Sequence, residues 1–142
     1  MSTGRLRAAI ALLSLAGAGI AAYLVYTRYS GDSIFCSTGG CETVQHSKYA
    51  VVAGIPVAVL GLVGYAAIIA TAAFPGPTSA ALGVTFAAIG VAFSGYLLYA
   101  QLVLIDAICQ YCVANDVVIS VVAALCLWRF LREQLAASPA PG

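Results

Sequence analysis

The chain has 142 residues, of which 63% are hydrophobic and 8% are charged, and its formal net charge is +1. A globular domain is about half apolar and about a quarter charged, so this composition favours a protein built for lipid. The few basic residues are scattered, which leaves no electrostatic footprint for nucleic acid or for an anionic surface. A soluble core is also disfavoured, because no residue from Tyr49 to Ile105 is charged.

The apolar runs predict four membrane-spanning helices, because a helix needs about 20 apolar residues to cross the hydrocarbon. The uncharged central stretch is long enough for two spans and is broken at 74–79, where two prolines and a glycine cannot continue a helix. A cleaved signal peptide is the alternative for the first run, but signal h-regions are only about 7 to 15 residues long, so a retained helix is expected. The predicted spans are residues 8–27, 50–73, 79–104 and 111–130.

The distribution of basic residues predicts the orientation of these spans. Four arginines flank the two termini, whereas the first loop is neutral, so the positive-inside bias places both termini in the cytoplasm. Glycine and alanine are dense within the spans, which allows helices to approach closely in lipid. The sequence therefore predicts an all-α membrane protein, with residues 1–135 forming a four-helix bundle and 136–142 a short flexible tail.

Four of the five cysteines form two close pairs, Cys36 with Cys41 in the first loop and Cys109 with Cys112 at the start of span four. An odd number of spans precedes each pair, so both are expected on the extracytoplasmic side, where they can exchange disulfides. The Cys-x-x-Cys spacing places two thiols one helical turn apart, and unpaired amides at a helix start stabilise a thiolate. The glycines between the loop cysteines make a flexible hairpin that can carry a disulfide toward another thiol.

Two other interpretations of the pairs remain open, namely structural disulfides that staple the loops and a zinc site with four thiolate ligands. A structural disulfide does not explain a Cys-x-x-Cys beside the membrane plane, and a closed zinc site would be unusual with one pair on a glycine-rich loop. The spacing therefore favours redox chemistry without a metal. The fifth cysteine, Cys126, lies within span four and is expected to be a small buried hydrophobe.

A serine and a Gly-Ile-Pro-Val-Ala segment stand between the two pairs. In chain order the features are Cys36 and Cys41, Ser47, residues 54–58 and residues 109–112. Their order and spacing resemble the bacterial vitamin K epoxide reductase homologues, over nearly the whole chain, although the gap between the loop cysteines is shorter than is usual in that family. The DsbB type of quinone-linked oxidase carries its Cys-x-x-Cys in the first loop, so the reversed order argues against that type.

The resemblance implies a bundle around a quinone, ubiquinone or menaquinone, in the bacterial inner membrane. It also implies that Cys36 meets the thiolate of a thioredoxin-fold, DsbA-like partner, that Cys41 carries the electrons to Cys109, and that Cys112 faces the quinone. The expected activity is that of a thiol:quinone oxidoreductase that reoxidises its partner and supports disulfide formation in exported proteins. The short tail predicts that the partner is a separate protein. The alternative function is a non-catalytic membrane scaffold with structural disulfides.

Five further residues are candidates for quinone binding or proton transfer: Ser47, Leu97, Gln101, Ile105 and Asp116. Leu97, Gln101 and Ile105 repeat every four residues and predict one helix face near Cys112, although Gln101 could instead make a helix–helix hydrogen bond. Asp116 is a carboxylate close to the membrane, where charge is expensive, and it stands where vertebrate relatives have a quinone-contacting tyrosine. The alternative for Asp116 is an interfacial residue in water. Ser47 matches a family hydroxyl near the quinone, or it caps a short helix.

Overall fold

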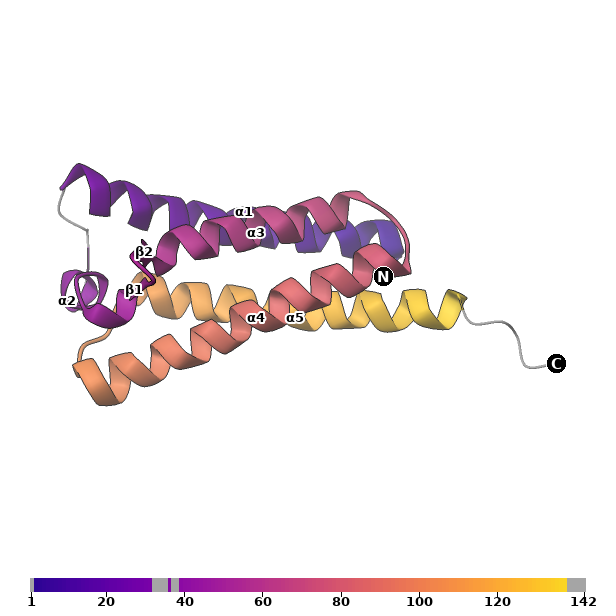
Figure 1. Ribbon diagram of the computed structural model, residues 1–142. Helices are drawn as coiled ribbons and strands as arrows, with labels where there is room; N and C mark the ends of the chain where they lie inside the picture. The colour runs from indigo at the N-terminus through magenta and orange to yellow at the C-terminus, as the bar shows by residue number, and fades with distance from the viewer. Residues whose placement is uncertain (1, 32–35, 37–38, 138–142) are drawn as a thin grey trace.

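The computed structural model describes residues 2–31, 36 and 39–137. Four long helices lie side by side in this part of the chain (Figure 1): α1 Thr3–Ser30, α3 Val57–Ala73, α4 Pro77–Tyr99 and α5 Gln110–Ala137. Both α1 and α4 pack against α3 and α5, so the four helices form a closed bundle. The mostly helical fold that the sequence predicts is confirmed.

The connection from α1 to α3 contains the smaller elements: α2 Cys41–Gln45, η1 Lys48–Ala50, β1 Val51–Val52 and β2 Ile55–Pro56. The two strands pair antiparallel, and the turn residues Ala53 and Gly54 have φ values of 53° and 83°. Positive φ at both central residues is what a tight hairpin turn requires. The hairpin and α2 lie at the end of the bundle where α5 begins (Figure 1).

This hairpin shortens the second of the predicted spans. The apolar run predicted a helix over 50–73, whereas α3 begins at Val57, because the turn reverses the chain and Pro56 sets the start of the helix. The third span is longer than predicted, since a π-helical segment, η2 Ala100–Ile105, continues α4. The predicted flexible tail began at 136, but α5 continues to Ala137, and residues 138–142 lie outside the described part of the chain.

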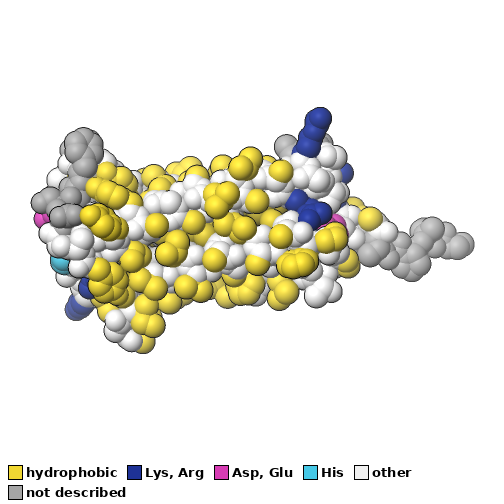
Figure 2. Space-filling view, turned by 90° about the horizontal axis from the view of Figure 1, so that it is seen from above, with side chains coloured by type: hydrophobic (Ala, Val, Ile, Leu, Met, Phe, Trp, Pro, Cys, Tyr) yellow, Lys and Arg dark blue, Asp and Glu magenta, His cyan; other side chains and the backbone are white. Residues whose placement is uncertain are grey.

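Three helices in the described ranges are long and apolar enough to cross a membrane, namely Thr3–Ser30, Pro77–Ile105 and Gln110–Ala136. The helix α3 is apolar but has 17 residues, about 25 Å of helix against about 30 Å of hydrocarbon. Figure 2 shows hydrophobic side chains along the flank of the bundle, with the charged side chains in view gathered at its two ends. Large apolar side chains remain exposed, for example Leu12 at 66% and Val63 at 62%. An apolar flank with charged ends is the surface of a membrane protein.

Glycines let the helices approach closely inside the bundle. A Cβ atom added at Gly17 of α1 would lie 2.3 Å from Cζ of Tyr65 in α3, and one at Gly90 of α4 would lie 2.9 Å from Cγ1 of Ile119 in α5. Side chains at these positions would therefore force the helix pairs apart. Cys126 is buried in the same apolar core, at 3% exposure, which confirms the prediction of a small buried hydrophobe.

Two arginines close the end of the bundle opposite α2. Arg7 of α1 and Arg129 of α5 donate hydrogen bonds to carbonyl oxygens over residues 71–74, at the C-terminal end of α3. The last carbonyls of a helix have no partner within it, and cations there also complement the helix dipole. Arg129 is 2% exposed and forms a salt bridge of 2.9 Å with Glu133, so its buried charge is paired.

Candidate functional site

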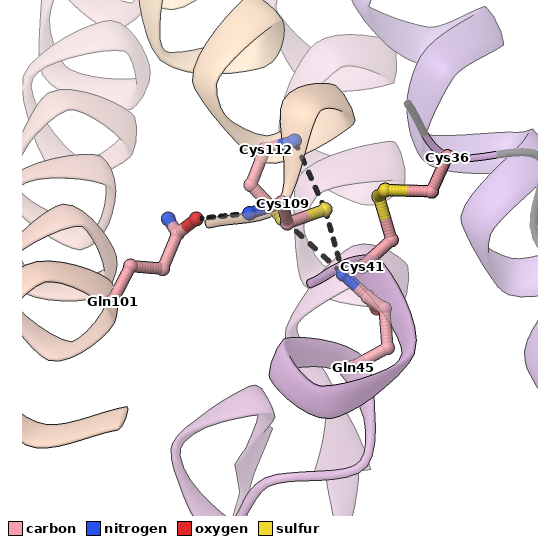
Figure 3. The surroundings of a disulfide bond; sticks show 6 residues. All are labelled: Cys36, Cys41, Gln45, Gln101, Cys109 and Cys112. Atoms are coloured by element: carbon pink, nitrogen blue, oxygen red, sulfur yellow. Dashed lines mark hydrogen bonds between the residues drawn. A yellow bond between two sulfur atoms is a disulfide. The ribbon is translucent and has the colours of Figure 1, made fainter. Parts of the chain in front are cut away.

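Two pairs of cysteines meet at the end of the bundle that carries α2. Cys36 and Cys41 are joined by a disulfide, with their Cα atoms 6.1 Å apart, whereas Cys109 and Cys112 are free thiols. Cys41 and Cys109 are fully buried in one cluster with Val44, and the other two cysteines pack against it. Figure 3 shows the disulfide beside the free pair. The structure therefore places an oxidised pair in contact with a reduced pair.

Gly40, the residue before Cys41, makes this contact close. A Cβ atom added at Gly40 would lie 2.5 Å from the carbonyl oxygen of Ile108 and 2.8 Å from its nitrogen. Backbone atoms cannot move aside as a flexible side chain can, so only glycine fits between these two segments. The backbone before Cys41 thereby lies directly against the backbone before Cys109.

Gln101 holds the Cys109 backbone from the other side. Its Oε1 accepts a hydrogen bond of 2.8 Å from the Cys109 N–H, and its Nε2 donates to the Leu97 carbonyl oxygen at 3.4 Å. The side chain is 1% exposed, and an amide N–H buried this deeply would be costly without a partner. Gln101 therefore fixes the position of the first cysteine of the Cys-x-x-Cys.

Gln45, the last residue of α2, donates hydrogen bonds to both free thiols. Its Nε2 lies 3.2 Å from Sγ of Cys112 and 3.8 Å from Sγ of Cys109 (Figure 3). The backbone N–H of Cys112 also donates to Sγ of Cys109, at 3.4 Å. The free pair is therefore surrounded by hydrogen-bond donors rather than by apolar groups alone.

These donors favour the ionised form of Cys109. The hydrogen bond from the Cys112 side chain lowers the pKa of the Cys109 thiol most, burial opposes it, and further hydrogen bonds from the Cys112 backbone, Gln45 and the Tyr111 backbone bring that pKa to about 6. The thiolate is the nucleophilic form of cysteine in disulfide exchange. The hydrogen-bond donors therefore favour a reactive thiolate at Cys109 although this cysteine is buried.

A cavity of about 340 Å³ lies among the four long helices, with Cys112 and Gln45 in its wall. Most of the wall is apolar, and the polar groups at its surface include Tyr65, Asn115 and Asp116. The Tyr65 hydroxyl donates to Asn115 Oδ1 at 2.9 Å, and one carboxyl oxygen of Asp116 is buried without a hydrogen-bond partner. Pockets of about 300–1,000 Å³ with apolar walls and a few polar groups are typical of small-molecule sites.

The structure separates the residues predicted to share a helix face. Leu97 lines the cavity, whereas Gln101 binds the Cys109 backbone and Ile105 packs against the cysteine cluster. The four-residue repeat assumed an α-helix, but from Ala100 onward the chain is π-helical, and the wider turn rotates the later residues away from that face. Of the three, only Leu97 lies where the repeat placed it.

Asp116 and Ser47, the two other candidates, also differ in position. Asp116 lines the cavity, one turn of α5 beyond Cys112, and its carboxyl interacts with Ser94 of α4. Ser47 stands at the start of η1, the capping position considered for it, but its hydroxyl donates to the Val44 carbonyl oxygen at 2.7 Å and makes no cap hydrogen bond. Ser47 is outside the cavity wall and supports the end of α2.

Sequence reasoning missed Gln45, Tyr65 and Asn115. Gln45 stands four residues after Cys41, and this spacing places both residues on one face of a helix, so a predicted helix at 41–45 would have indicated it. Tyr65 lies in mid-helix, where it does not look interfacial, and its hydroxyl needs a buried partner. For Asn115 the only signal was a polar side chain in an otherwise apolar span.

An apolar helical bundle that holds an oxidised and a reduced cysteine pair together defines a class, the membrane thiol oxidoreductases. Comparison with known families agrees with this class, since the Vitamin K epoxide reductase family model matches residues 8–127. The chain belongs to this family. Among the described residues no group of three or more His, Cys, Asp or Glu side chains is placed to hold a metal ion.

A curated relative is the protein named "Thiol-disulfide oxidoreductase LTO1" of Arabidopsis thaliana. The two chains are 44% identical over 54 residues, which are 37% of this chain and 14% of the relative. The match therefore spans a small part of that relative, whose name describes a thiol-disulfide oxidoreductase.

Proposed function

We propose that the protein is a membrane thiol:quinone oxidoreductase that takes electrons from a separate thioredoxin-fold, DsbA-like partner and passes them to ubiquinone or menaquinone. The observation that carries this proposal is the contact between the Cys36–Cys41 disulfide and the free Cys109 and Cys112, with Cys112 in the cavity wall. Electrons that arrive at the loop pair have a direct path to a molecule bound between the helices.

The cavity fits the head group of a quinone. A quinone ring is flat and apolar apart from two carbonyl oxygens, and the wall is mostly apolar with a few polar groups. The Asn115 amide and the Asp116 carboxyl lie on α5 on the same side as Cys112, where they can meet a carbonyl oxygen or supply a proton. A quinone reaches such a site from the surrounding lipid, which the apolar flank of the bundle contacts.

The transfer begins at the loop pair. The partner's thiolate attacks Sγ of Cys36, the Cys36–Cys41 bond breaks, and Cys41 leaves as a thiolate. The partner's second thiol then displaces Cys36 and completes the partner's own disulfide. The loop pair has now accepted two electrons, and Cys36 and Cys41 are both free thiols.

The second exchange moves these electrons inward. The Cys41 thiolate attacks Cys109 of a Cys109–Cys112 disulfide and releases Cys112, and Cys36 then closes on Cys41 and releases Cys109. The result is a loop disulfide with two free inner thiols, which is the arrangement in the structure. When the inner pair returns to a disulfide, it gives up two electrons and two protons, which convert the quinone to a quinol. Because 30 mV corresponds to about 1.4 kcal/mol for a two-electron couple, the higher potential of a quinone favours this direction.

The proposed location is the bacterial inner membrane, crossed four times. Both termini would then face the cytoplasm, and both cysteine pairs would face the extracytoplasmic side. The bundle supports this arrangement, since α2 and the start of α5 lie at one end of it, whereas α1 begins and α5 ends at the other (Figure 1). Disulfide formation in exported proteins takes place on that outer side.

The decisive experiment measures anaerobic quinone reduction with a reduced thioredoxin-fold partner as electron donor. We expect rapid reduction with the intact protein and only the background rate with Cys112→Ser, because the inner disulfide cannot form. Cys126→Ala is the matched control, since that cysteine lies outside the cysteine cluster, and it should keep the full rate. Equal rates for the intact protein and Cys112→Ser would end the proposal.

A membrane scaffold with structural disulfides is the other candidate function. A scaffold would not need a cysteine in the wall of a cavity, where Cys112 lies. A thiol-trapping gel separates the two functions. A partner that lacks its second cysteine should open the Cys36–Cys41 disulfide, release the Cys41 thiolate and remain attached to Cys36 as a mixed disulfide, whereas a scaffold would trap no partner.

A further inference from the structure

The carboxamide of Gln45 is the polar group that reaches both inner thiols. It is 7% exposed, it lines the cavity together with Cys112, and its nitrogen lies within hydrogen-bond distance of both sulfur atoms. Since Gln45 ends α2 and Cys41 begins it, the same short helix carries the incoming electrons and this amide.

The disulfide exchange releases a thiolate at the inner pair in two successive steps, and each thiolate is stabilised by a hydrogen-bond donor. When the Cys41 thiolate attacks Cys109, the Cys41–Cys109 bond forms, the Cys109–Cys112 bond breaks, and the bonding electron pair goes to Cys112. When Cys36 then displaces Cys109, the negative charge appears on Cys109. An NH₂ group has two N–H donors and transfers no proton, so one carboxamide can stabilise either thiolate, and hydrogen bonds to charged acceptors are the stronger ones.

We propose that Gln45 is a catalytic residue that stabilises the thiolates of Cys112 and Cys109 in turn as electrons pass from the loop pair to the cavity. This inference rests on the proposed function for its role in turnover, although the hydrogen bonds themselves do not depend on it. Gln45 thereby joins the four cysteines as the fifth residue of the relay.

The surroundings hold Gln45 in place. Arg28 of α1 donates to the Gln45 backbone oxygen at 2.5 Å, and the adjacent Val44 is buried in the cysteine cluster. Among the described residues, two charged groups act near the inner pair: Arg28 behind Gln45, and Asp116 of α5, whose carboxylate opposes negative charge on Cys112. Glu42 lies on the exposed side of α2. The donor from Gln45 acts on Cys112 in the opposite direction to this carboxylate.

The test compares two variants of the full chain in lipid nanodiscs, each with the loop disulfide intact and with Cys126→Ala. Gln45→Met keeps the length of the side chain but has no N–H donor, and Gln45→Glu replaces the donor with a carboxylate. Thr43→Ala, on the exposed side of α2, is the control. The thiolate absorbance of the inner pair is measured against pH, because Cys109 is fully buried and a labelling reagent does not reach it. Quinone reduction is measured at pH 7.

We expect the midpoint for Cys109, about 6 in the parent protein, to rise by about one pH unit in Gln45→Met and by more in Gln45→Glu, and to stay unchanged in the control. Quinone reduction at pH 7 should fall about twofold in Gln45→Met, because the ionised fraction of Cys109 drops from about nine tenths to about one half when its midpoint moves from about 6 to about 7. The lower rate should recover partly as the pH rises, whereas a loss of packing alone would lower the rate at every pH.

If the Cys109 midpoint is unchanged in Gln45→Met, Gln45 does not stabilise the thiolate and contributes only packing. The titration requires neither quinone nor partner. A parent protein that reduces no quinone would therefore overturn the proposed function, while the titration still decides whether Gln45 stabilises the thiolate. If Gln45→Met does not fold, the same midpoint is measured in Gln45→Leu, which is also uncharged and has no N–H donor. A rise there supports the inference, and no rise overturns it.

Discussion

The reactivity of Cys109 comes from the hydrogen bonds that its sulfur accepts. Burial alone disfavours a thiolate and would make this cysteine inert. At Cys109 the hydrogen bond from the Cys112 side chain is the largest effect, and together with the other donors it outweighs burial, which lowers the pKa to about 6. A fully buried sulfur can therefore still take part in an internal exchange, as the sulfur that Cys41 attacks and that later leaves as a thiolate.

The effect of Cys112 on Cys109 predicts a pH profile. The thiolate absorbance of the inner pair follows the ionisation of Cys109, so in the parent protein it should rise through about pH 6. Cys112→Ala removes the main donor and should move the midpoint upward by about two units, toward the ordinary cysteine value of about 8.5. Cys112→Ser keeps an O–H donor and should move it less.

The same shift should appear in stability. Because the folded pKa of Cys109 lies below the unfolded value, the unfolded state binds more protons between about pH 6 and 8.5, and the free energy of unfolding should rise across that window. In Cys112→Ala this rise should largely disappear. A midpoint that stays near 6 in Cys112→Ala would show that the donors named here do not cause the shift.

The four cysteines of the two pairs could be identified from the sequence, whereas the role of Gln45 became visible only in the structure. Cysteine spacing was enough to single out Cys36, Cys41, Cys109 and Cys112, because a thiol has few other roles beside a membrane. A glutamine has many roles, and the only signal for Gln45 was its position four residues after Cys41, which becomes informative once a helix at 41–45 is known. Its role depends on which sulfur atoms its amide reaches, and that is set by how α2 docks against the start of α5.

Two short elements, α2 and η2, bring the cysteine pairs together. The α2 helix has five residues and is too short to be stable alone, so it depends on the bundle beneath it. It packs against η2. The residue after η2, Asp106, has the left-handed conformation, with a φ of 56°. A π-helical turn is often found at functional sites, and here it turns the chain toward Cys109.

Gly40→Ala should separate the two cysteine pairs. The added methyl group would meet the Ile108 backbone, so α2 would have to move away from Cys109. In a Cys36→Ser/Cys112→Ser background, mild oxidation should join Cys41 to Cys109, and mass spectrometry measures the yield. We expect a high yield with glycine at this position and a low one with alanine.

Thr43→Ala is the matched control for this trapping experiment, because it alters the exposed side of the same helix. It should leave the Cys41–Cys109 yield unchanged. A high yield in Gly40→Ala would mean that the backbone contact at Ile108 does not set the distance between the pairs.

Gly17→Ala tests the packing of α1 against α3. The new methyl group would overlap the Tyr65 ring, which is 2% exposed and donates its hydroxyl hydrogen to Asn115 in the cavity wall. Overpacking of this kind destabilises a protein by about 1–3 kcal/mol. We expect that loss in the free energy of unfolding, measured by denaturant titration in mixed micelles, together with weaker quinone binding.

Gly19→Ala lies on the same helix, with no atom within 4 Å of the added Cβ, and should be neutral or slightly stabilising, since alanine favours helices. Equal stability of Gly17→Ala and Gly19→Ala would show that the Tyr65 ring has room to move.

The element boundaries show where a pattern of apolar residues stops being informative. Apolar runs locate the long helices well, because only a helix satisfies its backbone within lipid. The same runs did not reveal the hairpin at 51–56 or the π-helical segment at 100–105, since both are as apolar as the helices they adjoin. Both depend on local turn geometry and on tertiary contacts, and the π-helical segment displaced Gln101 and Ile105 from the predicted helix face.

At the scale of the whole molecule, the bundle has two different ends. One carries the cysteine pairs, α2 and the polar residues around them, whereas the other is closed by Arg7 and Arg129 on the C-terminal end of α3. A relay that starts with a water-soluble protein and finishes with a lipid-soluble quinone needs its thiols at one membrane surface. The bundle provides that location at a single end.

The orientation of this bundle depends on α3, the shortest of the long helices. All four run side by side, so α3 should cross the membrane wherever its neighbours do, with the hairpin at 51–56 completing its length. In a background without native cysteines, Asp106→Cys adds a thiol near Cys109 and Pro75→Cys adds one between α3 and α4, both at exposed positions. A membrane-impermeant maleimide on intact spheroplasts should label the first and not the second. A cysteine restored at Cys36 should be labelled like the one at 106. Labelling of positions 36 and 106 from opposite sides would mean that α3 does not cross, and the two cysteine pairs could not then exchange electrons.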